Sequence, residues 1–194
     1  MRMDYLGDSY DIVKQSLLRW LQLFGKWAVH PMFTEPFPPA QVIAYESLLG
    51  ANVLSAEVLT LDTNRAAYFA CASSSGNLFL DPDTGLRVMS TRGAHAPKYL
   101  FARDLSQLSE HRPHSLTVVF DQSVGRGSVQ SRRSHLEDKL RNLRALGICG
   151  FAYISHACFV ISSRDQDLVE HARAHIIAES RLPESRFLSI AAAA

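Results

Sequence analysis

The sequence predicts an α/β domain of three layers, with a mostly parallel central sheet and an antiparallel C-terminal hairpin. Helical and strand patterns alternate along most of the chain, which is typical of α/β proteins. Continuous apolar runs such as LFL (78–80) and SLTVVF (115–120) are typical of strands buried on both faces. We expect one domain over residues 1–190, followed by a disordered AAAA tail at 191–194.

The first half predicts two helices and three strands. Asp8 or Ser9 can cap a helix that continues on an apolar face to Phe24, before Gly25. WAVHPMF, residues 27–33, predicts a strand that ends at the proline-rich EPFPP. A second helix is expected over residues 40–49. NVLSAEVLTL (52–61) and AAYFACA (66–72) predict two strands joined by the turn residues DTN.

The second half alternates between helices and strands. Helical character at residues 98–109 precedes the β-branched strand SLTVVF. An S-x-x-E capping box opens a predicted helix at residues 134–146, after a polar loop. GFAYISHACFVISS (150–163) predicts a hairpin with a turn near residues 155–157, and Asp165 can cap a last helix.

Composition excludes several classes of protein. The chain has 194 residues, 47% hydrophobic and 20% charged, with a net charge of +1, so no overall field attracts nucleic acid or membrane. No apolar run is long enough to span a membrane, and no secretory signal is visible. The three cysteines, an odd number set among apolar or small residues, predict core thiols in the reduced cytoplasm.

Two predicted strands end in carboxylates. LFL runs into Asp81 and Asp83, and VVF runs into Asp121. Ligands of open α/β sheets bind at the carboxyl ends of the strands, so we expect these three aspartates to converge at a catalytic site. Such a cluster is also a candidate Mg²⁺ or Mn²⁺ site, since like charges need a cation among them. The alternative is that the aspartates only shape turns.

Other residues could bind a substrate at the same edge. The first helix offers Asp8, Ser9 and Lys14 near its N-terminus, which favours an anion. VGRGS (124–128) could cradle a phosphate, and the chain's basic concentration begins here. The residues assigned to substrate binding are Asp8, Ser9, Lys14, Ser123, Arg126, Arg132 and Arg133. The arginines would hold phosphates, so a nucleic acid or nucleotide is the expected partner.

Residues 76–163 resemble the later part of class I, S-adenosylmethionine-dependent methyltransferases. In that family a strand ending in an acidic-Pro motif such as D-P-P-Y is followed by a helix, a strand, another helix and an antiparallel hairpin. LFLDPDTGL and the elements after it have that order. The resemblance implies a Rossmann-like fold and a role for Asp81 and Pro82 in positioning a target base or amine. It also places an S-adenosylmethionine site after the first strand, at Thr34 and Glu35.

The first half departs from that family, because WAVHPMFTEPFPP contains no glycine and has the bulky Phe33 and Phe37 instead. The motifs GDSYD, DPDTGL and FDQS also resemble a family of uncharacterised bacterial proteins, which implies no activity. Three hypotheses follow. The chain is a methyltransferase-like enzyme acting on nucleic acid or a nucleotide, a divalent-metal nuclease or phosphodiesterase, or a non-catalytic binding module. The first leads, and it predicts that Asp81→Ala abolishes function with little loss of stability.

Overall fold

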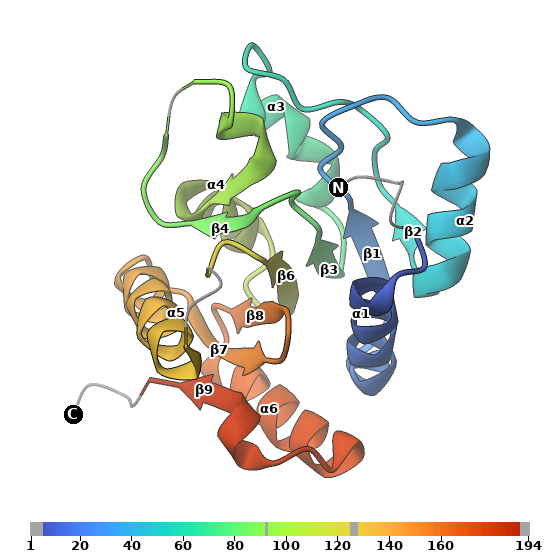
Figure 1. Cartoon of the computed structure of the whole chain (residues 1–194). Helices are drawn as coiled ribbons and strands as arrows, with labels where there is room; N and C mark the ends of the chain where they lie inside the picture. Colours follow the sequence, from blue (N-terminus) through green and yellow to red (C-terminus); the bar gives the residue numbers. More distant parts are fainter. Residues whose placement is uncertain (1–5, 92, 125–127, 191–194) are drawn as a thin grey trace.

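The computed structural model describes residues 6–91, 93–124 and 128–190. Within these residues the central sheet has seven strands in the order β2-β1-β3-β6-β8-β7-β9 (Figure 1). Their bounds are β1 Trp27–His30, β2 Asn52–Val53, β3 Asn77–Leu80, β6 Thr117–Asp121, β7 Cys149–Ile154, β8 Cys158–Ser163 and β9 Phe187–Ser189. The first four strands of that order are parallel, and β8 is antiparallel to both β6 and β7. The predicted mostly parallel sheet with an antiparallel hairpin is confirmed.

Helices cover both faces of the sheet, which gives three layers (Figure 1). Their bounds are α1 Ser9–Trp20, α2 Pro39–Leu49, α3 Arg65–Tyr68, α4 Ala102–His111, α5 Val129–Ala145 and α6 Gln166–Ser180. Helices α1, α2 and α6 pack on the face that carries Phe79 and Phe120. Helices α3, α4 and α5 pack on the face that carries Leu80 and Val119. The fold is therefore Rossmann-like, as predicted.

The chain reverses direction across the sheet between β1 and β3. From β1 it passes to β2 on one side, and it then returns to β3 on the other side of β1. Ligands in open α/β sheets bind at such a switch point, outside the carboxyl ends of the strands. This edge is where His30 ends β1 and Asp81 follows β3. A ligand site is thus expected beside Asp81.

A second, two-stranded parallel sheet lies beside this edge. It pairs β4, Gly85–Arg87, with β5, Tyr99–Phe101. A helix was predicted from residue 98, whereas α4 begins at Ala102. Residues 99–101 instead form the strand β5, which pairs with β4, and Leu100 is buried there.

Two predicted strands of the first half are wrong. Only Asn52–Val53 forms a strand within 52–61, and 66–72 forms α3 and a 3-10 turn. Asn64, predicted as a turn residue, caps α3 by accepting a hydrogen bond from the backbone N–H of Ala67 at 3.2 Å. The cap directs the alanine-rich segment into a helix, and its aromatic side chains still reach the core.

Most other boundaries agree with the prediction, with α5 as the main exception. It begins at Val129, because Ser128 rather than Ser134 is its cap. The predicted helix caps Asp8 and Asp165 are confirmed, as is the short turn between β7 and β8. The edge strand β9 was not predicted. Part of the predicted phosphate loop (125–127) and the predicted tail (191–194) lie outside the described residues.

None of the helices in the described ranges combines the length and apolarity needed to cross a bilayer.

Candidate functional site

A cavity of about 430 Å³ lies at the carboxyl edge of the sheet, beside the first turn of α1. We call it the α1 pocket. It is lined by Asp8, Tyr10, Asp11, Lys14, Asp81, Pro82, Asp83, Lys98, Phe120 and Gln122. The lining residues come from α1, from the ends of β3 and β6, and from the turn before β5. The pocket therefore lies next to the switch point, where the fold favours a ligand.

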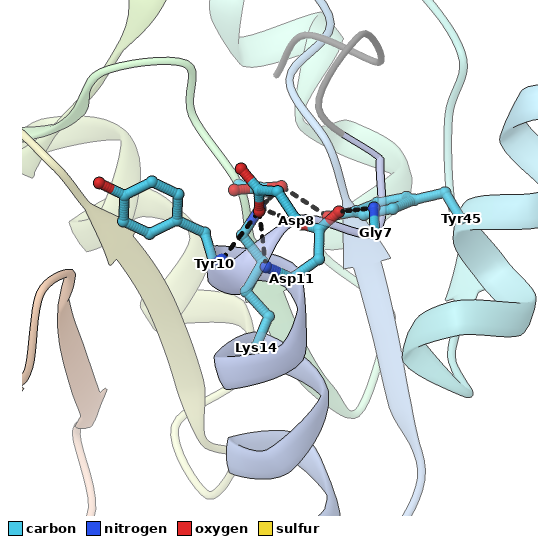
Figure 2. Close-up of polar contacts among 7 residues, drawn as sticks. Gly7, Asp8, Tyr10, Asp11, Lys14 and Tyr45 are labelled. Carbon is cyan, nitrogen blue, oxygen red and sulfur yellow. Dashed lines mark hydrogen bonds and ion pairs between the residues drawn. The ribbon is translucent and has the colours of Figure 1, made fainter.

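The N-terminus of α1 is fixed by Asp8. Its carboxylate accepts hydrogen bonds from the backbone N–H groups of Tyr10 at 2.8 Å and Asp11 at 3.1 Å. This cap holds the first turn in place, so Tyr10, Asp11 and Lys14 all line the pocket (Figure 2). The predicted substrate-binding residues Asp8 and Lys14 are thus at the pocket. Ser9 is exposed and is not among its lining residues.

A buried charged network forms the floor of the pocket. The Lys14 ammonium donates to Asp11 and to Asp81, each at 2.9 Å. The Tyr45 phenol, which comes from α2 (Figure 2), donates to the same Asp81 oxygen, Oδ2, at 2.6 Å. The side chains of Lys14, Asp11 and Asp81 are 5%, 3% and 2% exposed, so all three charges are desolvated.

The network fixes the protonation of its two donors. Burial disfavours the charged form of Lys14, but Asp81 and Asp11 outweigh it and raise the lysine pKa above its ordinary value. Burial, with the charge of Asp81, raises the pKa of Tyr45 well above its ordinary value. At neutral pH, Lys14 is therefore an ammonium and Tyr45 a phenol, and both donate to Asp81.

An aromatic wall borders the carboxylates. The ring of Tyr10 lies edge-on to Phe120, with centroids 5.7 Å apart. It also stacks on His156, from the turn between β7 and β8, at 4.7 Å. The Lys14 ammonium lies 4.5 Å from the centre of the Phe120 ring. Three separate elements thus fix the ring of Tyr10, which is partly exposed and could stack on a planar ligand. Phe120 is only 3% exposed and has the Lys14 ammonium over its ring, so it supports Tyr10 and offers no stacking face of its own.

The lining of the pocket has an excess of negative charge. Four carboxylates (Asp8, Asp11, Asp81 and Asp83) face two ammonium groups (Lys14 and Lys98). Asp83 and Lys98 lie 3.7 Å apart at the open side, where the lysine is 43% exposed. The pocket is consequently better suited to a ligand that donates hydrogen bonds or carries positive charge than to a bare phosphate.

Asp81 and Asp121 lie on opposite faces of the sheet, so the structure does not bring the predicted aspartate cluster together. The pairing of Leu80 with Val119 places Asp81 beside Phe120. Because side chains alternate between faces, Asp81 points to the α1 side and Asp121 to the α5 side. Of the three aspartates predicted to converge, Asp81 and Asp83 line the pocket and Asp121 does not.

Asp121 has a separate set of partners. It accepts hydrogen bonds from the Lys139 ammonium at 2.5 Å and from the Ser123 hydroxyl at 2.7 Å. Backbone N–H groups of Ser123 and Leu86 donate to it at 3.0 and 3.2 Å. The carboxylate therefore ties α5 and β4 to the end of β6. Asp121 and Ser123, predicted at the site, form a structural brace on the opposite face.

The described residues contain no group of three or more His, Cys, Asp or Glu side chains that could hold a metal ion. Each predicted metal-binding aspartate has a lysine beside it: Lys14 beside Asp81, Lys98 beside Asp83, and Lys139 beside Asp121. The ammonium groups supply the positive charge that the sequence analysis assigned to Mg²⁺ or Mn²⁺.

The predicted S-adenosylmethionine residues lie away from the pocket. Thr34 and Glu35 follow β1 and are not among the pocket's lining residues. Phe33, 1% exposed, belongs to the core at this point. Its ring packs against Phe37, with centroids 4.9 Å apart. Aromatic side chains thus occupy the space after β1 where the resemblance implied a cofactor.

The predicted phosphate-binding arginines hold backbone carbonyls. Arg132 donates to the carbonyl of Ser155 at 2.9 Å, and Arg133 to that of Ser185 at 2.8 Å. These bonds tie α5 to the β7–β8 turn and to the segment before β9. Arg126 lies outside the described residues.

Several residues that line the pocket or hold its floor were not predicted from the sequence. Asp11 had a local signal, because it is three residues before Lys14 on the same helix. Tyr45 had none, since it lies 36 residues from Asp81 and reaches it only through the packing of α2. Tyr10 and Phe120 were assigned to no site, although each lies beside a residue of the predicted site.

His30, at the end of β1, is an acid-sensitive group of the described core. Its ring is buried beside Tyr68 and Phe69, and neither ring nitrogen has a hydrogen-bond partner among the described residues. Burial lowers the pKa of His30 from 6.5 to about 4. The unfolded chain binds this proton first as pH falls. Stability is therefore retained above pH 6.5 and lost between about 6.5 and 4, by roughly 3 kcal/mol.

We expect His30→Leu to remove that part of the pH dependence. Urea unfolding measured between about pH 7.5 and 4 checks this, because the gap between wild type and His30→Leu should change by about 3 kcal/mol over the range. The matched control is His135→Leu, at an exposed position on α5. Parallel curves for wild type and His30→Leu would contradict the assignment.

Comparison of the chain with protein-family models, curated proteins and solved structures found no match in any of the three.

Proposed function

We propose that this chain recognises the base of a nucleoside or nucleotide in the α1 pocket, as a binding module on a Rossmann-like scaffold. The observation that carries the proposal is the junction of Asp81 and Asp83 with the ring of Tyr10 in one cavity. Carboxylates accept hydrogen bonds from an exocyclic amine, and aromatic rings stack on a planar base.

The charged network supports a fixed acceptor at the floor of the pocket. Both hydrogen bonds to Asp81 enter at Oδ2, from Lys14 and Tyr45. Oδ1 has no hydrogen bond among the described residues, and we assign it to the amine as one of two acceptors, with the Asp83 carboxylate as the other. Because two donors hold the carboxylate in one orientation, the ligand does not have to order it.

The excess of carboxylates favours a base with an amino group. Adenine and cytosine carry an exocyclic amine that can donate to Asp81 or Asp83, whereas thymine carries carbonyl oxygens that would meet like charge. We expect adenosine and cytidine to bind, and thymidine to bind at least about tenfold more weakly. A phosphate would have to lie at the open side, near Lys98, which is 43% exposed.

A second candidate is a methyltransferase-like enzyme, favoured by the order of the elements. Asp81-Pro82 follows β3 directly, and α4, β6, α5 and the β7–β8 hairpin come after it in the order noted for that family. Against it stands the packing of Phe33 and Phe37 after β1. The binding proposal does not need that space, so it leads.

A thermal-shift and calorimetric panel separates the two candidates. The ligands are adenosine, cytidine, thymidine, S-adenosylmethionine, S-adenosylhomocysteine and MnCl₂. A ligand at 100 times its dissociation constant stabilises by about 2.7 kcal/mol, or roughly 5–10 °C for a chain of this size. A shift with adenosine and cytidine alone supports base recognition. A larger shift with S-adenosylmethionine and S-adenosylhomocysteine than with adenosine would favour the methyltransferase.

The variant Asp83→Asn tests the pocket itself. Asp83 is 15% exposed and lines the cavity, so its loss should weaken binding of the amine-bearing nucleosides at least about tenfold. The control is Asp138→Asn, on the exposed face of α5 with a side chain 67% exposed. Equal affinity in the two variants, or equal binding of thymidine and cytidine by wild type, would overturn the proposal.

A further inference from the structure

A second cavity, of about 380 Å³, opens beside the start of β7. We call it the edge pocket. It is lined by Leu140, Arg144, Ile148, Cys149, Gly150, Phe151, Gln166, Val169, Glu170, Arg173, Ser189 and Ile190. Strands β6 and β7 are both antiparallel to β8, so β7 starts at the opposite edge of the sheet from the α1 pocket. The two cavities are therefore independent.

The cavity exists because β9 is shorter than the strand it covers. Strand β7 spans Cys149–Ile154, but β9 pairs only with Phe151, Ala152 and Tyr153. Helices α5 and α6 pack on opposite faces of β7 (Figure 1). The uncovered start of β7 is left as the floor of a hollow between two helices.

The lining combines an apolar interior with cationic groups. Leu140, Ile148, Phe151, Val169 and Ile190 supply the apolar surface. Arg144 comes from α5 and Arg173 from α6, against one carboxylate, Glu170. The lining thus carries a net charge of +1. The net charge of this lining is opposite in sign to that of the α1 pocket, where carboxylates outnumber ammonium groups.

Arg173 is held in place with a donor to spare. Its Nη2 donates to Glu184 at 2.7 Å, which fixes the guanidinium from one side. Its Nε is buried and has no hydrogen-bond partner among the described residues. A ligand cannot reach an atom that is closed off from water. Nη1 of Arg173, however, is open to water and has no hydrogen bond among the described residues, so a carboxylate in the cavity is an acceptor of the right charge for it.

We propose that the edge pocket binds an organic acid with an apolar body, whose carboxylate pairs with Arg173. The volume lies within the range of small-molecule sites. The apolar residues cover the body of the ligand, and the guanidinium provides a planar, permanently charged partner for its head group. The site is separate from the proposed base-binding function and does not depend on it.

The test uses octanoate, octanol and octylamine as probes of matched length. Binding is followed by calorimetry and by methyl chemical shifts of Ile148, Val169 and Ile190, which line the cavity. We expect octanoate to bind at least about tenfold more tightly than octanol, and octylamine to bind weakest. The methyl shifts should be confined to the edge pocket.

Two variants distinguish the role of the Arg173 guanidinium from the role of its ion pair with Glu184. Arg173→Met removes the proposed partner of the carboxylate and should weaken octanoate binding at least about tenfold. Glu184→Gln breaks the same ion pair but keeps the guanidinium, so it should retain octanoate binding. Thermal melts confirm that both variants are folded. Octanol binding as tightly as octanoate, or unchanged binding in Arg173→Met, would overturn the proposal, as would equal losses in the two variants.

Discussion

Lys14→Met is expected to lower the free energy of unfolding by about 3–5 kcal/mol, the usual cost of removing one partner from a buried ion pair. The ammonium is 5% exposed and lies 2.9 Å from both Asp11 and Asp81. Methionine has a similar volume but no charge. The substitution leaves two carboxylates, 3% and 2% exposed, without the cation between them. Their desolvation is no longer compensated.

The same substitution at Lys98 is the matched control. Lys98 also lines the α1 pocket, but it is 43% exposed and lies 3.7 Å from Asp83. Exposed ion pairs contribute about 0–1 kcal/mol, so Lys98→Met should be nearly neutral. Urea unfolding of both variants measures the difference, and we expect Lys14→Met to melt about 10 °C lower. Equal stabilities would show that Lys14 is not part of a desolvated network.

The same network revises the expectation for Asp81. From the sequence, a carboxylate at a strand end carries little packing, and Asp81→Ala should leave stability almost unchanged. In the structure Asp81 is 1% exposed and accepts from Lys14 and Tyr45. Removing it leaves the buried Tyr45 hydroxyl without its acceptor and Lys14 with Asp11 alone, so a clear loss of stability is expected along with any loss of function. Asp83→Asn is the cleaner probe of the pocket for that reason.

The fold was predictable where the hydrophobic pattern of a segment identifies the element on its own. The buried runs at β3 and β6, the apolar face of α1 and the pairing of β7 with β8 all follow from local pattern. Prediction failed where tertiary contacts decide. Tyr68 and Phe69 favour a strand by composition, yet Asn64 caps a helix that buries both. The three-residue strands β4, β5 and β9 are too short to show a period.

The candidate site was predictable only in part, because the face of a sheet depends on register. The sequence places Asp81 and Asp121 after neighbouring strands. Whether they share a face depends on the pairing of Leu80 with Val119, a non-local contact that the local pattern does not contain. The same holds for Tyr45, which reaches Asp81 from another helix. The location of the site could be predicted from the sequence, but which residues form it could not.

The second large effect is expected at Gly85, the first residue of β4, where the turn after β3 ends. Its φ is +132°, a conformation that residues with a side chain rarely adopt. A Cβ at this position would overlap Oδ1 of Asp121 and lie 2.9 Å from the Asp121 Cα. Strain in the backbone and overpacking each cost about 1–3 kcal/mol. Gly85→Ala should therefore lower the free energy of unfolding by roughly 3–5 kcal/mol.

Gly50→Ala is the control for a positive φ without a close contact. Gly50 also has a positive φ, +65°, but nothing lies within 4 Å of where its Cβ would be. It should cost only about 1 kcal/mol, the penalty of the left-handed conformation alone. The excess at Gly85 then measures the contact with Asp121, whose carboxylate is fixed by Lys139 and Ser123, together with the larger backbone strain of a φ of +132°. If Gly85→Ala lowers the free energy of unfolding no more than Gly50→Ala does, the Asp121 side chain moves away to make room for the methyl group. In that case the turn is not held against β6, and Asp81 and Asp83 are not rigidly placed at the mouth of the α1 pocket.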